Sequence, residues 1–251
     1  MRWILILIRL PLVLIFVLLG FLVIFLLHIL AGKHWFQRPS GKRVINLWMT
    51  LFAFIVGLKI HVRGQPHPGL LAANHISWLD IIALDAVIAS RFVSKDDVMS
   101  WPVIGLLPKW SGTFFLQRGS AAAVSRLNSE IVEALQQQST VAVFPEGTTH
   151  DGEQVHRFFS ALLQAGIDSG ATVQAVAIRY SRDGEPDVIA PFINDHNIVT
   201  HLLSVLGTGR IDVYLDFLEA FVPHDIKRKA LAELLHDQIA LEFTKPVEKL
   251  T

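Results

Sequence analysis

The chain contains no cysteine among its 251 residues. This absence excludes disulfide bonds, thiolate nucleophiles, iron–sulfur clusters and zinc sites with cysteine ligands. Charged residues are also few, at 18%, against about 25% in ordinary soluble domains. Hydrophobic residues reach 52%, and the mean hydropathy is +0.46. This composition excludes a disordered chain and is too apolar for an ordinary cytosolic protein.

Acidic residues are absent from residues 1–79, which carry eight Lys and Arg side chains. The remaining 14 basic and 22 acidic residues give residues 80–251 a net charge of −8. A nucleic-acid-binding protein concentrates basic charge on its folded domain, so this distribution argues against nucleic acid as a partner. A basic and apolar N-terminal region suits anionic lipid, and we therefore expect membrane lipid as a partner.

An uncharged run of 23 residues extends from Leu10 to Gly32, and 18 of its members are Leu, Ile, Val or Phe. As a helix it would be about 34 Å long, enough for a hydrocarbon core of about 30 Å. A signal peptide has a shorter apolar core with a small-residue cleavage site, and a buried core helix rarely runs this long without a polar stripe. The run therefore favours a membrane helix over both alternatives.

More basic residues follow this run than precede it, so the positive-inside rule places its C-terminal side in the cytoplasm. A second uncharged run, from Val44 to Leu58, is short for a span and predicts a helix that lies in the membrane interface or dips into one leaflet. We expect residues 1–60 to anchor the chain and residues 61–251 to form a cytoplasmic domain. The expected location is the inner membrane, as a single-pass or monotopic protein.

Strand and helix signals alternate after Arg63. A short apolar run predicts a strand at residues 69–73, and further strands are predicted at residues 91–94, 113–116, 140–144, 173–180 and 210–217. Helices are expected at residues 78–89, from 120 to about 138, from the end of the fourth strand to about 168, and at 227–244. Ser77 is expected to cap the first helix, with Asp80 at the capping-box position. The alternation predicts an α/β fold with a mixed, mostly parallel sheet flanked by helices.

His75 and Asp80 stand at the end of the first predicted strand and in the first turn of the helix that follows. A carboxylate at this position can fix the imidazole tautomer and stabilise the imidazolium, as in a Ser-His-Asp triad. No serine is required if the substrate's own hydroxyl is the nucleophile, and an imidazole pKa of about 6.5 suits a general base. The spacing alone leaves open a helix cap beside a surface histidine.

Two further segments place polar groups at the ends of predicted strands. The segment that begins at Gly112 ends in Arg118, whose guanidinium suits a phosphate or carboxylate. A buried strand is followed by residues 145–149, where Glu146 supplies a carboxylate and Gly147 permits close approach of backbone N–H groups to an anion. Alone, the first segment is better interpreted as an exposed strand end, and the second also fits a tight turn.

The combination of these segments resembles the glycerolipid acyltransferase family that includes 1-acylglycerol-3-phosphate acyltransferases. The matching elements are Asn-His-x-Ser-Trp-x-Asp from Asn74, which contains the His-x4-Asp pattern, Gly-x-Phe-Phe-x-x-Arg from Gly112, and Phe-Pro-Glu-Gly-Thr from Phe144. The resemblance covers about residues 60–220. It implies a glycerol-phosphate acyltransferase-like fold that is preceded by a membrane helix and an interfacial helix.

The resemblance also implies an activity. A fatty acyl chain would move from acyl-CoA or acyl-carrier protein to the hydroxyl of a lysolipid, most simply 1-acyl-glycerol-3-phosphate giving phosphatidic acid. His75 would be the general base and Asp80 its partner, and the reaction would need neither a metal nor a further cofactor. Acceptor binding would fall to Arg118, Glu146, Gly147, Thr148 and Thr149.

Three positions depart from the family's pattern. Thr149 stands where arginine is usual, Phe159 where lysine is frequent, with Arg157 two residues before it, and Ala175 where proline is usual. The departures concern the acceptor's head group, so a lyso-ornithine lipid or another lysophospholipid is the alternative acceptor. An inactive membrane lipid-binding protein on the same fold is the alternative from a different class, and the intact His75 argues against it.

Other enzyme classes lack their signatures in this chain. The sequence contains no Gly-x-Ser-x-Gly of serine hydrolases, no His-Glu-x-x-His of zinc peptidases, no P-loop and no dinucleotide-binding glycine fingerprint.

Overall fold

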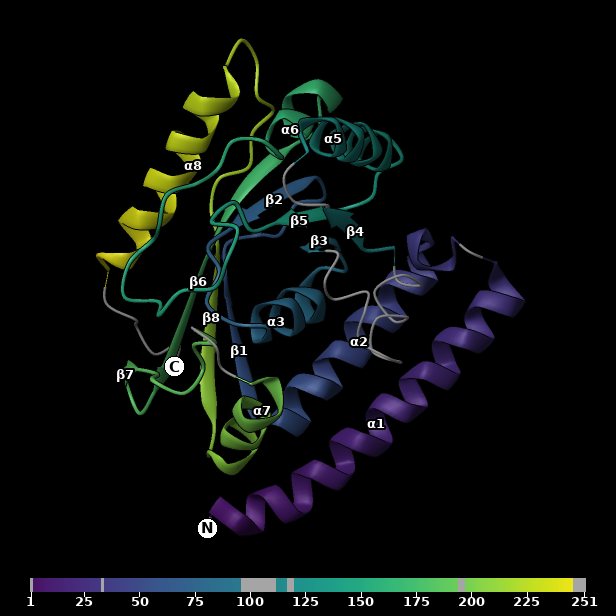
Figure 1. Cartoon of the computed structure of the whole chain (residues 1–251), viewed down its shortest axis with the longest axis vertical. Helices are drawn as coiled ribbons and strands as arrows, with labels where there is room; N and C mark the ends of the chain where they lie inside the picture. Colours follow the sequence, from purple (N-terminus) through teal and green to yellow (C-terminus); the bar gives the residue numbers. More distant parts are fainter. Residues whose placement is uncertain (1, 33, 96–111, 117–119, 194–196, 246–251) are drawn as a thin grey trace.

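The computed structural model describes residues 2–32, 34–95, 112–116, 120–193 and 197–245 (Figure 1). Eight strands in these residues form one sheet in the order β1-β8-β6-β2-β5-β3-β4, with β7 paired to β6. The strands are β1 Leu58–Arg63, β2 Leu70–Ala73, β3 Arg91–Lys95, β4 Phe114–Leu116, β5 Val141–Val143, β6 Val173–Arg182, β7 Glu185–Pro186 and β8 Ile211–Phe217.

Most neighbouring strands run in parallel. The parallel pairs are β1 with β8, β2 with β6, β2 with β5, β3 with β5 and β3 with β4. Only β8 and β7 run antiparallel to β6 among the described pairs. The predicted mixed, mostly parallel sheet is therefore confirmed.

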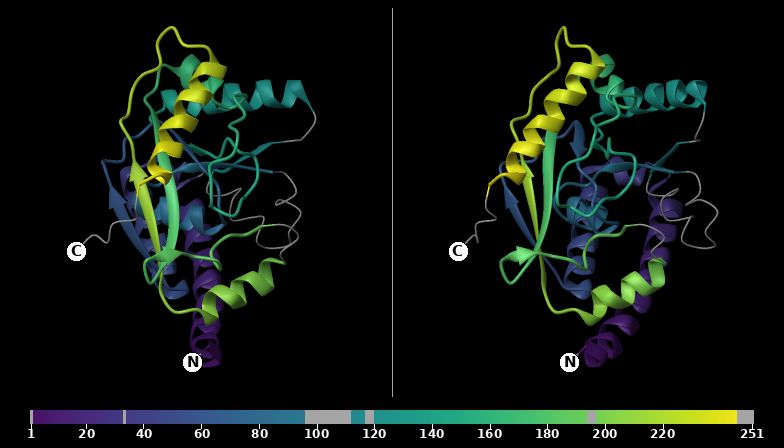
Figure 2. Two further views of the ribbon diagram at one scale, coloured as in Figure 1. Left: turned by 90° about the vertical axis from the view of Figure 1, so that its left-hand side faces the viewer. Right: turned by 60° about the vertical axis from the view of Figure 1, so that its left-hand side comes forward.

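Helices cover both faces of the sheet (Figures 1 and 2). They are α1 Arg2–Ala31, α2 Pro39–Val56, α3 Leu79–Val87, α5 Ala121–Gln136, α6 Gln164–Ser169, α7 Ile198–Gly207 and α8 Arg228–Phe243, with a 3-10 turn at Trp35–Gln37. Side chains of α1, α2, α3 and α7 form one core with the sheet face that carries Leu71 and Ala73. Those of α5, α6 and α8 form a second core on the face that carries Leu70 and Ala72. This division follows from the alternation of side chains along each strand.

The N-terminal apolar run is helical, as predicted, and α1 is longer than the expected span. Its 30 residues extend about 45 Å. Along this length α1 packs on α2, where the ring of Phe16 stacks on Trp48 with centroids 4.0 Å apart. Near its N-terminus α1 packs on α7, where Arg9 donates hydrogen bonds to the carbonyls of Leu206 at 3.2 Å and Thr208 at 2.6 Å. The helix therefore lies against the body of the protein (Figure 1).

The second apolar run forms α2, which packs between α1 and α3 (Figure 1). It ends at Gly57, where a φ of 92° closes the helix before β1 begins at Leu58. Its outer side exposes Leu47, Leu51 and Phe54, spaced so that they share one face of the helix. The expected boundary between residues 60 and 61 falls inside β1.

Two predictions about local structure are wrong. The helix expected from residue 144 to about 168 is absent, because the chain after β5 makes turns until the short helix α6. Pro145 follows β5, Gly147 has a φ of 73°, and the N–H of Phe159 returns to the carbonyl of Pro145, all of which oppose a continuous helix.

The second wrong prediction is that Ser77 caps the helix that follows it. The helix α3 begins at Leu79, and no side chain caps it. Among the described residues the buried hydroxyl of Ser77 has no hydrogen-bond partner, whereas its backbone N–H donates to Asp80. Asp80 thus makes its half of the expected capping box, and Ser77 does not.

Candidate active site

The end of β2 is fixed to the neighbouring strand by Asn74. Its side-chain amide donates to the carbonyl of Ile178 at 3.0 Å and accepts from the N–H of the same residue at 2.8 Å. Because Asn74 is 2% exposed, both hydrogen bonds are buried. These two hydrogen bonds continue the pairing of β2 with β6 by one residue, and the next residue, His75, is the first that lies outside the sheet.

His75 and Asp80 meet as predicted. The Nδ1 atom of His75 lies 2.7 Å from Oδ2 of Asp80, whose side chain is fully buried. The same oxygen accepts the backbone N–H groups of Ile76 at 2.8 Å and Ser77 at 2.9 Å. Nδ1 therefore donates to the carboxylate, and Nε2 is the nitrogen that can accept a proton.

The ring of His75 is held on its flat side by Phe144, at the end of β5. The two ring centroids are 3.9 Å apart and the planes differ by 12°. The histidine side chain keeps 18% of its surface exposed, so a substrate can reach it. The rings of Phe144 and Phe92 are also stacked, at 6.1 Å, which extends this support to β3.

Glu146 holds the backbone of His75. Its Oε2 accepts the N–H of His75 at 2.6 Å, and its Oε1 accepts the N–H of His156 at 2.7 Å. The residue is 4% exposed, and this burial raises the pKa of its carboxyl to about 7 despite the two backbone donors. Both carboxylate oxygens are thus occupied by the protein itself.

The loop after Glu146 also holds the backbone of His75. The N–H of His150 donates to the carbonyl of His75 at 2.9 Å, and the N–H of Gly147 donates to the carbonyl of Phe144 at 3.0 Å. The hydroxyl of Thr149 donates to the carbonyl of Phe192, whereas Gly147 and Thr148 are exposed. The loop binds both backbone groups of the histidine and leaves residues 147 and 148 open to a ligand.

Two basic residues named from the sequence differ in what the structure says of them. Arg118 lies outside the described residues. Arg157 is exposed, with its guanidinium 5.8 Å from the ring centroid of Phe159, which is also exposed.

Burial lowers the pKa of His150, whose ring stacks on His156 with centroids 3.6 Å apart. Within the described residues, no group of three or more His, Asp or Glu side chains could hold a metal ion.

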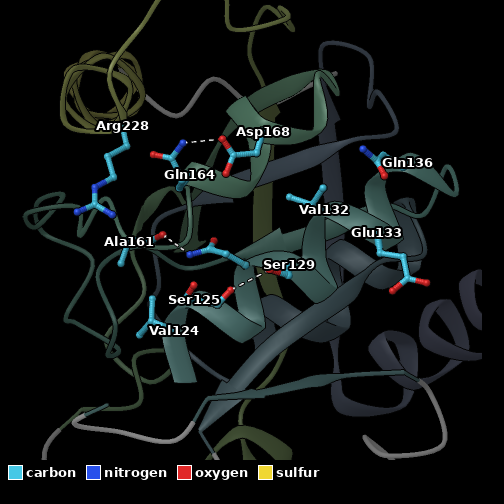
Figure 3. Close-up of a pocket in the computed structure, with 11 residues that line it drawn as sticks. Val124, Ser125, Ser129, Val132, Glu133, Gln136, Ala161, Gln164, Asp168 and Arg228 are labelled. Atoms are coloured by element: carbon cyan, nitrogen blue, oxygen red, sulfur yellow. Dashed lines mark hydrogen bonds between the residues drawn. The ribbon is translucent and has the colours of Figure 1, made fainter. Parts of the chain in front are cut away.

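A groove lies elsewhere, between α5, α6 and the start of α8 (Figure 3). Its volume is about 690 Å³, and polar side chains such as Asn128, Gln164, Asp168 and Arg228 line it. None of its lining residues belongs to the segments around His75, so the groove is separate from the candidate site.

Comparison with known proteins identifies the family. A model described as Acyltransferase matches residues 59–179. The chain is 36% identical over 206 residues to a lyso-ornithine lipid O-acyltransferase of Pseudomonas aeruginosa, covering 81% of this chain and 79% of that one. It is 36% identical over 184 residues to a 1-acyl-sn-glycerol-3-phosphate acyltransferase of Neisseria gonorrhoeae, covering 72% of each. The chain belongs to the acyltransferase family.

The fold of this acyltransferase has a counterpart among solved structures. The crystal structure of the 1-acyl-sn-glycerophosphate acyltransferase PlsC from Thermotoga maritima superimposes with a TM-score of 0.72 over 97% of both chains. Their sequence identity is 19%, so the likeness concerns the fold.

The contact of Tyr180 with the His75–Asp80 pair of this acyltransferase was not predicted from the sequence. The hydroxyl of Tyr180, in β6, donates to Oδ1 of Asp80 at 2.7 Å. Tyr180 lies just beyond the segment that the family model matches. A signal was present, because a tyrosine in a strand of apolar residues needs a partner for its hydroxyl when it is buried. The partner itself is 100 residues away in sequence and could not be read from the pattern.

Proposed function

We propose that this acyltransferase moves a fatty acyl chain from acyl-CoA or acyl-carrier protein to the hydroxyl of a lysolipid. The observation that supports this best is the Nδ1 of His75 at 2.7 Å from the fully buried carboxylate of Asp80. In the proposed step, Nε2 of His75 takes the proton of the acceptor hydroxyl while its oxygen attacks the thioester carbonyl carbon. The C–S bond then breaks, and the leaving thiolate takes the proton from the imidazolium.

Asp80 would act in both halves of this step. It holds the tautomer in which Nε2 is unprotonated, and its charge stabilises the imidazolium that forms when the proton arrives. A positioned general base contributes about 10²- to 10⁴-fold to a rate, so most of the activity depends on this pair.

The test is acyl transfer by the purified protein in detergent, followed as lysolipid-dependent release of free CoA. We expect His75→Ala and Asp80→Asn to lose about 10³-fold or more of kcat. The matched control is Asp212→Asn, because Asp212 pairs with His61 at the same 2.7 Å on the sheet face opposite Asp80.

Loss of activity in Asp80→Asn with retention in Asp212→Asn would support the proposal. Activity of His75→Ala within tenfold of the unsubstituted protein would refute it. No acyl transfer by the unsubstituted protein from either acyl-CoA or acyl-carrier protein, with lipid binding intact, would favour an inactive lipid-binding protein.

Acceptor binding is proposed for Arg118 and for the exposed Gly147 and Thr148. Glu146 serves this site by holding His75, since its two oxygens accept backbone N–H groups. The first acceptor is 1-acyl-glycerol-3-phosphate, which is the substrate named for the Neisseria relative. Its phosphate carries nearly two negative charges, which match an arginine best.

A lyso-ornithine lipid is the second candidate, and the orientation of Thr149 favours it. The hydroxyl of Thr149 donates to the carbonyl of Phe192, so position 149 offers a ligand neither a positive charge nor a free donor. A zwitterionic head group needs fewer cations than a phosphate monoester. The Pseudomonas relative carries this acceptor in its name. Competition between the two lysolipids for one acyl donor decides between them.

We also propose that the acyltransferase sits on one leaflet of the inner membrane with its catalytic domain in the cytoplasm. The anchor comprises α1 and α2, up to Gly57. α1 contacts the body at Arg9 and contacts α2 at Gly20, beside Trp48, about 16 Å further along the helix. Because α2 itself packs on α3, a helix crossing upright would draw the body into the bilayer. A helix lying in the interface keeps both contacts and turns its exposed apolar side chains to lipid.

Carbonate extraction and tag accessibility test this arrangement. Both an N-terminal and a C-terminal tag should be protected in intact spheroplasts and become accessible after lysis, with the protein retained by the membrane in carbonate. An N-terminal tag exposed on the outer side would contradict the monotopic arrangement and support a single span.

A further inference from the structure

The carboxylate of Asp80 is buried and is stabilised by hydrogen bonds. Its side chain is fully buried, and within the described chain no Lys or Arg forms an ion pair with it. Three donors meet Oδ2, namely His75 and the N–H groups of Ile76 and Ser77. One donor, the hydroxyl of Tyr180, meets Oδ1 at 2.7 Å. Oδ2 of Asp80 therefore binds the histidine and two backbone N–H groups, whereas Oδ1 binds the hydroxyl of Tyr180.

The sheet places Tyr180 over the end of β2. The register pairs Ala73, the last residue of β2, with Val176 of β6, and β6 continues from there to Arg182. Val176, Ile178 and Tyr180 point to the same face, in the core formed with α3. The ring of Tyr180 is 6% exposed, so packing fixes where its hydroxyl lies.

The tyrosine remains a donor over the working pH range. Burial and the neighbouring charge of Asp80 raise the pKa of Tyr180 well above its ordinary value of 10.0. A neutral hydroxyl that donates to a carboxylate holds its orientation and also disperses its negative charge.

We propose that Tyr180 is a positioning residue for the His75–Asp80 pair, holding Oδ1 so that Oδ2 is aimed at Nδ1 of the histidine. This inference rests on the proposed function, in which His75 is the base. Removal of the hydroxyl would loosen the carboxylate and lower kcat. It would also concentrate the remaining charge on Oδ2, stabilise the imidazolium, and move the acid limb of the pH–rate profile to higher pH.

Other titratable groups lie around the His75–Asp80 pair, and none of them is changed by a substitution at Tyr180. They are Glu146, His150 and His156 from the loop after β5, and Asp187, which follows β7. Because a change at Tyr180 leaves all of them in place, a shift of the acid limb between variants reports on Asp80 and His75.

The experiment compares Tyr180→Phe with Tyr214→Phe. Tyr214 is a matched control, because it is also buried and lies in the adjacent strand β8, but it faces the other side of the sheet and stacks on His61. We expect Tyr180→Phe to lose about 10- to 100-fold of kcat, with the acceptor KM within about twofold and the acid limb raised. Tyr214→Phe should keep both kcat and the acid limb.

A second measurement uses the fact that the chain has only two tyrosines. Incorporation of 3-fluorotyrosine into Tyr214→Phe labels position 180 alone with a stronger donor of nearly the same size. The stronger donor disperses more of the charge of Asp80, so the acid limb should move to lower pH, opposite to Tyr180→Phe. This test keeps the side chain and remains informative if Tyr180→Phe does not fold.

The outcomes separate the inference from the proposed function. An active His75→Ala variant refutes the proposed function itself. An inactive His75→Ala variant together with an unshifted acid limb in Tyr180→Phe and in the fluorotyrosine protein overturns only the inference. Equal losses of kcat in the two tyrosine variants, with the same lowering of melting temperature, also overturn it, because they indicate a packing role.

Discussion

Replacement of Asn74 by alanine tests how the end of β2 is held. The substitution removes both hydrogen bonds to Ile178 and leaves the N–H and the carbonyl of that residue buried without partners. Each orphaned group costs about 1–3 kcal/mol, so Asn74→Ala should destabilise the fold by about 2–6 kcal/mol. Domains have about 5–15 kcal/mol of stability in total, so this is a large fraction.

The assay is thermal unfolding in detergent. For a chain of this size, 1 kcal/mol corresponds to about 2–4 °C, so a loss near 4 kcal/mol lowers the melting temperature by about 8–16 °C. The control is Asn128→Ala, since Asn128 is half-buried on α5 and, within the described part of the chain, its side chain makes a single hydrogen bond, to the carbonyl of Ala161. That variant should shift by a few degrees at most.

Asn74→Asp sharpens the test. Its carboxyl can restore the donor to the carbonyl of Ile178 only when it is protonated. Because burial favours the protonated form, the variant should be most stable at acid pH and lose stability as the pH rises through its raised pKa. A melting temperature of Asn74→Ala within about 3 °C of the unsubstituted protein, or equal to that of Asn128→Ala, would refute the reasoning.

Two other predictions follow from burial and backbone conformation. Burial raises the pKa of Glu146 to about 7 from 4.5, so the folded protein keeps a proton that the unfolded chain releases. Stability should therefore fall by about 3 kcal/mol between pH 4.5 and pH 7, and Glu146→Gln should flatten that slope in a pH series of melting temperatures. Gly69→Ala should lower the melting temperature strongly, because φ is +147° and the new Cβ would lie 2.1 Å from the carbonyl oxygen of Thr172. Gly209→Ala has nothing within 4 Å of the new Cβ and should change the melting temperature little, and equal effects of the two alanines would contradict this reasoning.

Buried strands were the most predictable part of the fold. β2, β5 and β6 place side chains in both cores, so their sequences are largely continuous apolar runs. In β8 the apolar residues that enter one core alternate with polar residues such as Asp212 and Asp216. β1 was missed although its apolar residues alternate with Lys59, His61 and Arg63, a pattern typical of a half-buried strand, because the segment directly follows the apolar run that was assigned to the anchor. The helix α7 was also missed, although Asn197 caps it with a hydrogen bond of 2.8 Å, because ten residues give a weak periodic signal.

The site was predictable where its contacts are local in sequence. His75 and Asp80 are five residues apart, and the geometry of a strand followed by a helix brings them together. The hydrogen bonds from Asn74 to Ile178 and from Tyr180 to Asp80 span 104 and 100 residues. Such contacts depend on the register of the sheet, which no local pattern contains.

The site separates the group that is proposed to perform the chemistry from the groups proposed to choose the acceptor. Glu146 accepts the N–H of His75, and His150 donates to its carbonyl, so the loop after β5 fixes both backbone groups of the histidine. Thr149 lies between these two anchors with its side chain turned to Phe192. We therefore expect a substitution at position 149 to leave the position of His75 unchanged, because its backbone is held by Glu146 and His150 and not by the side chain of Thr149.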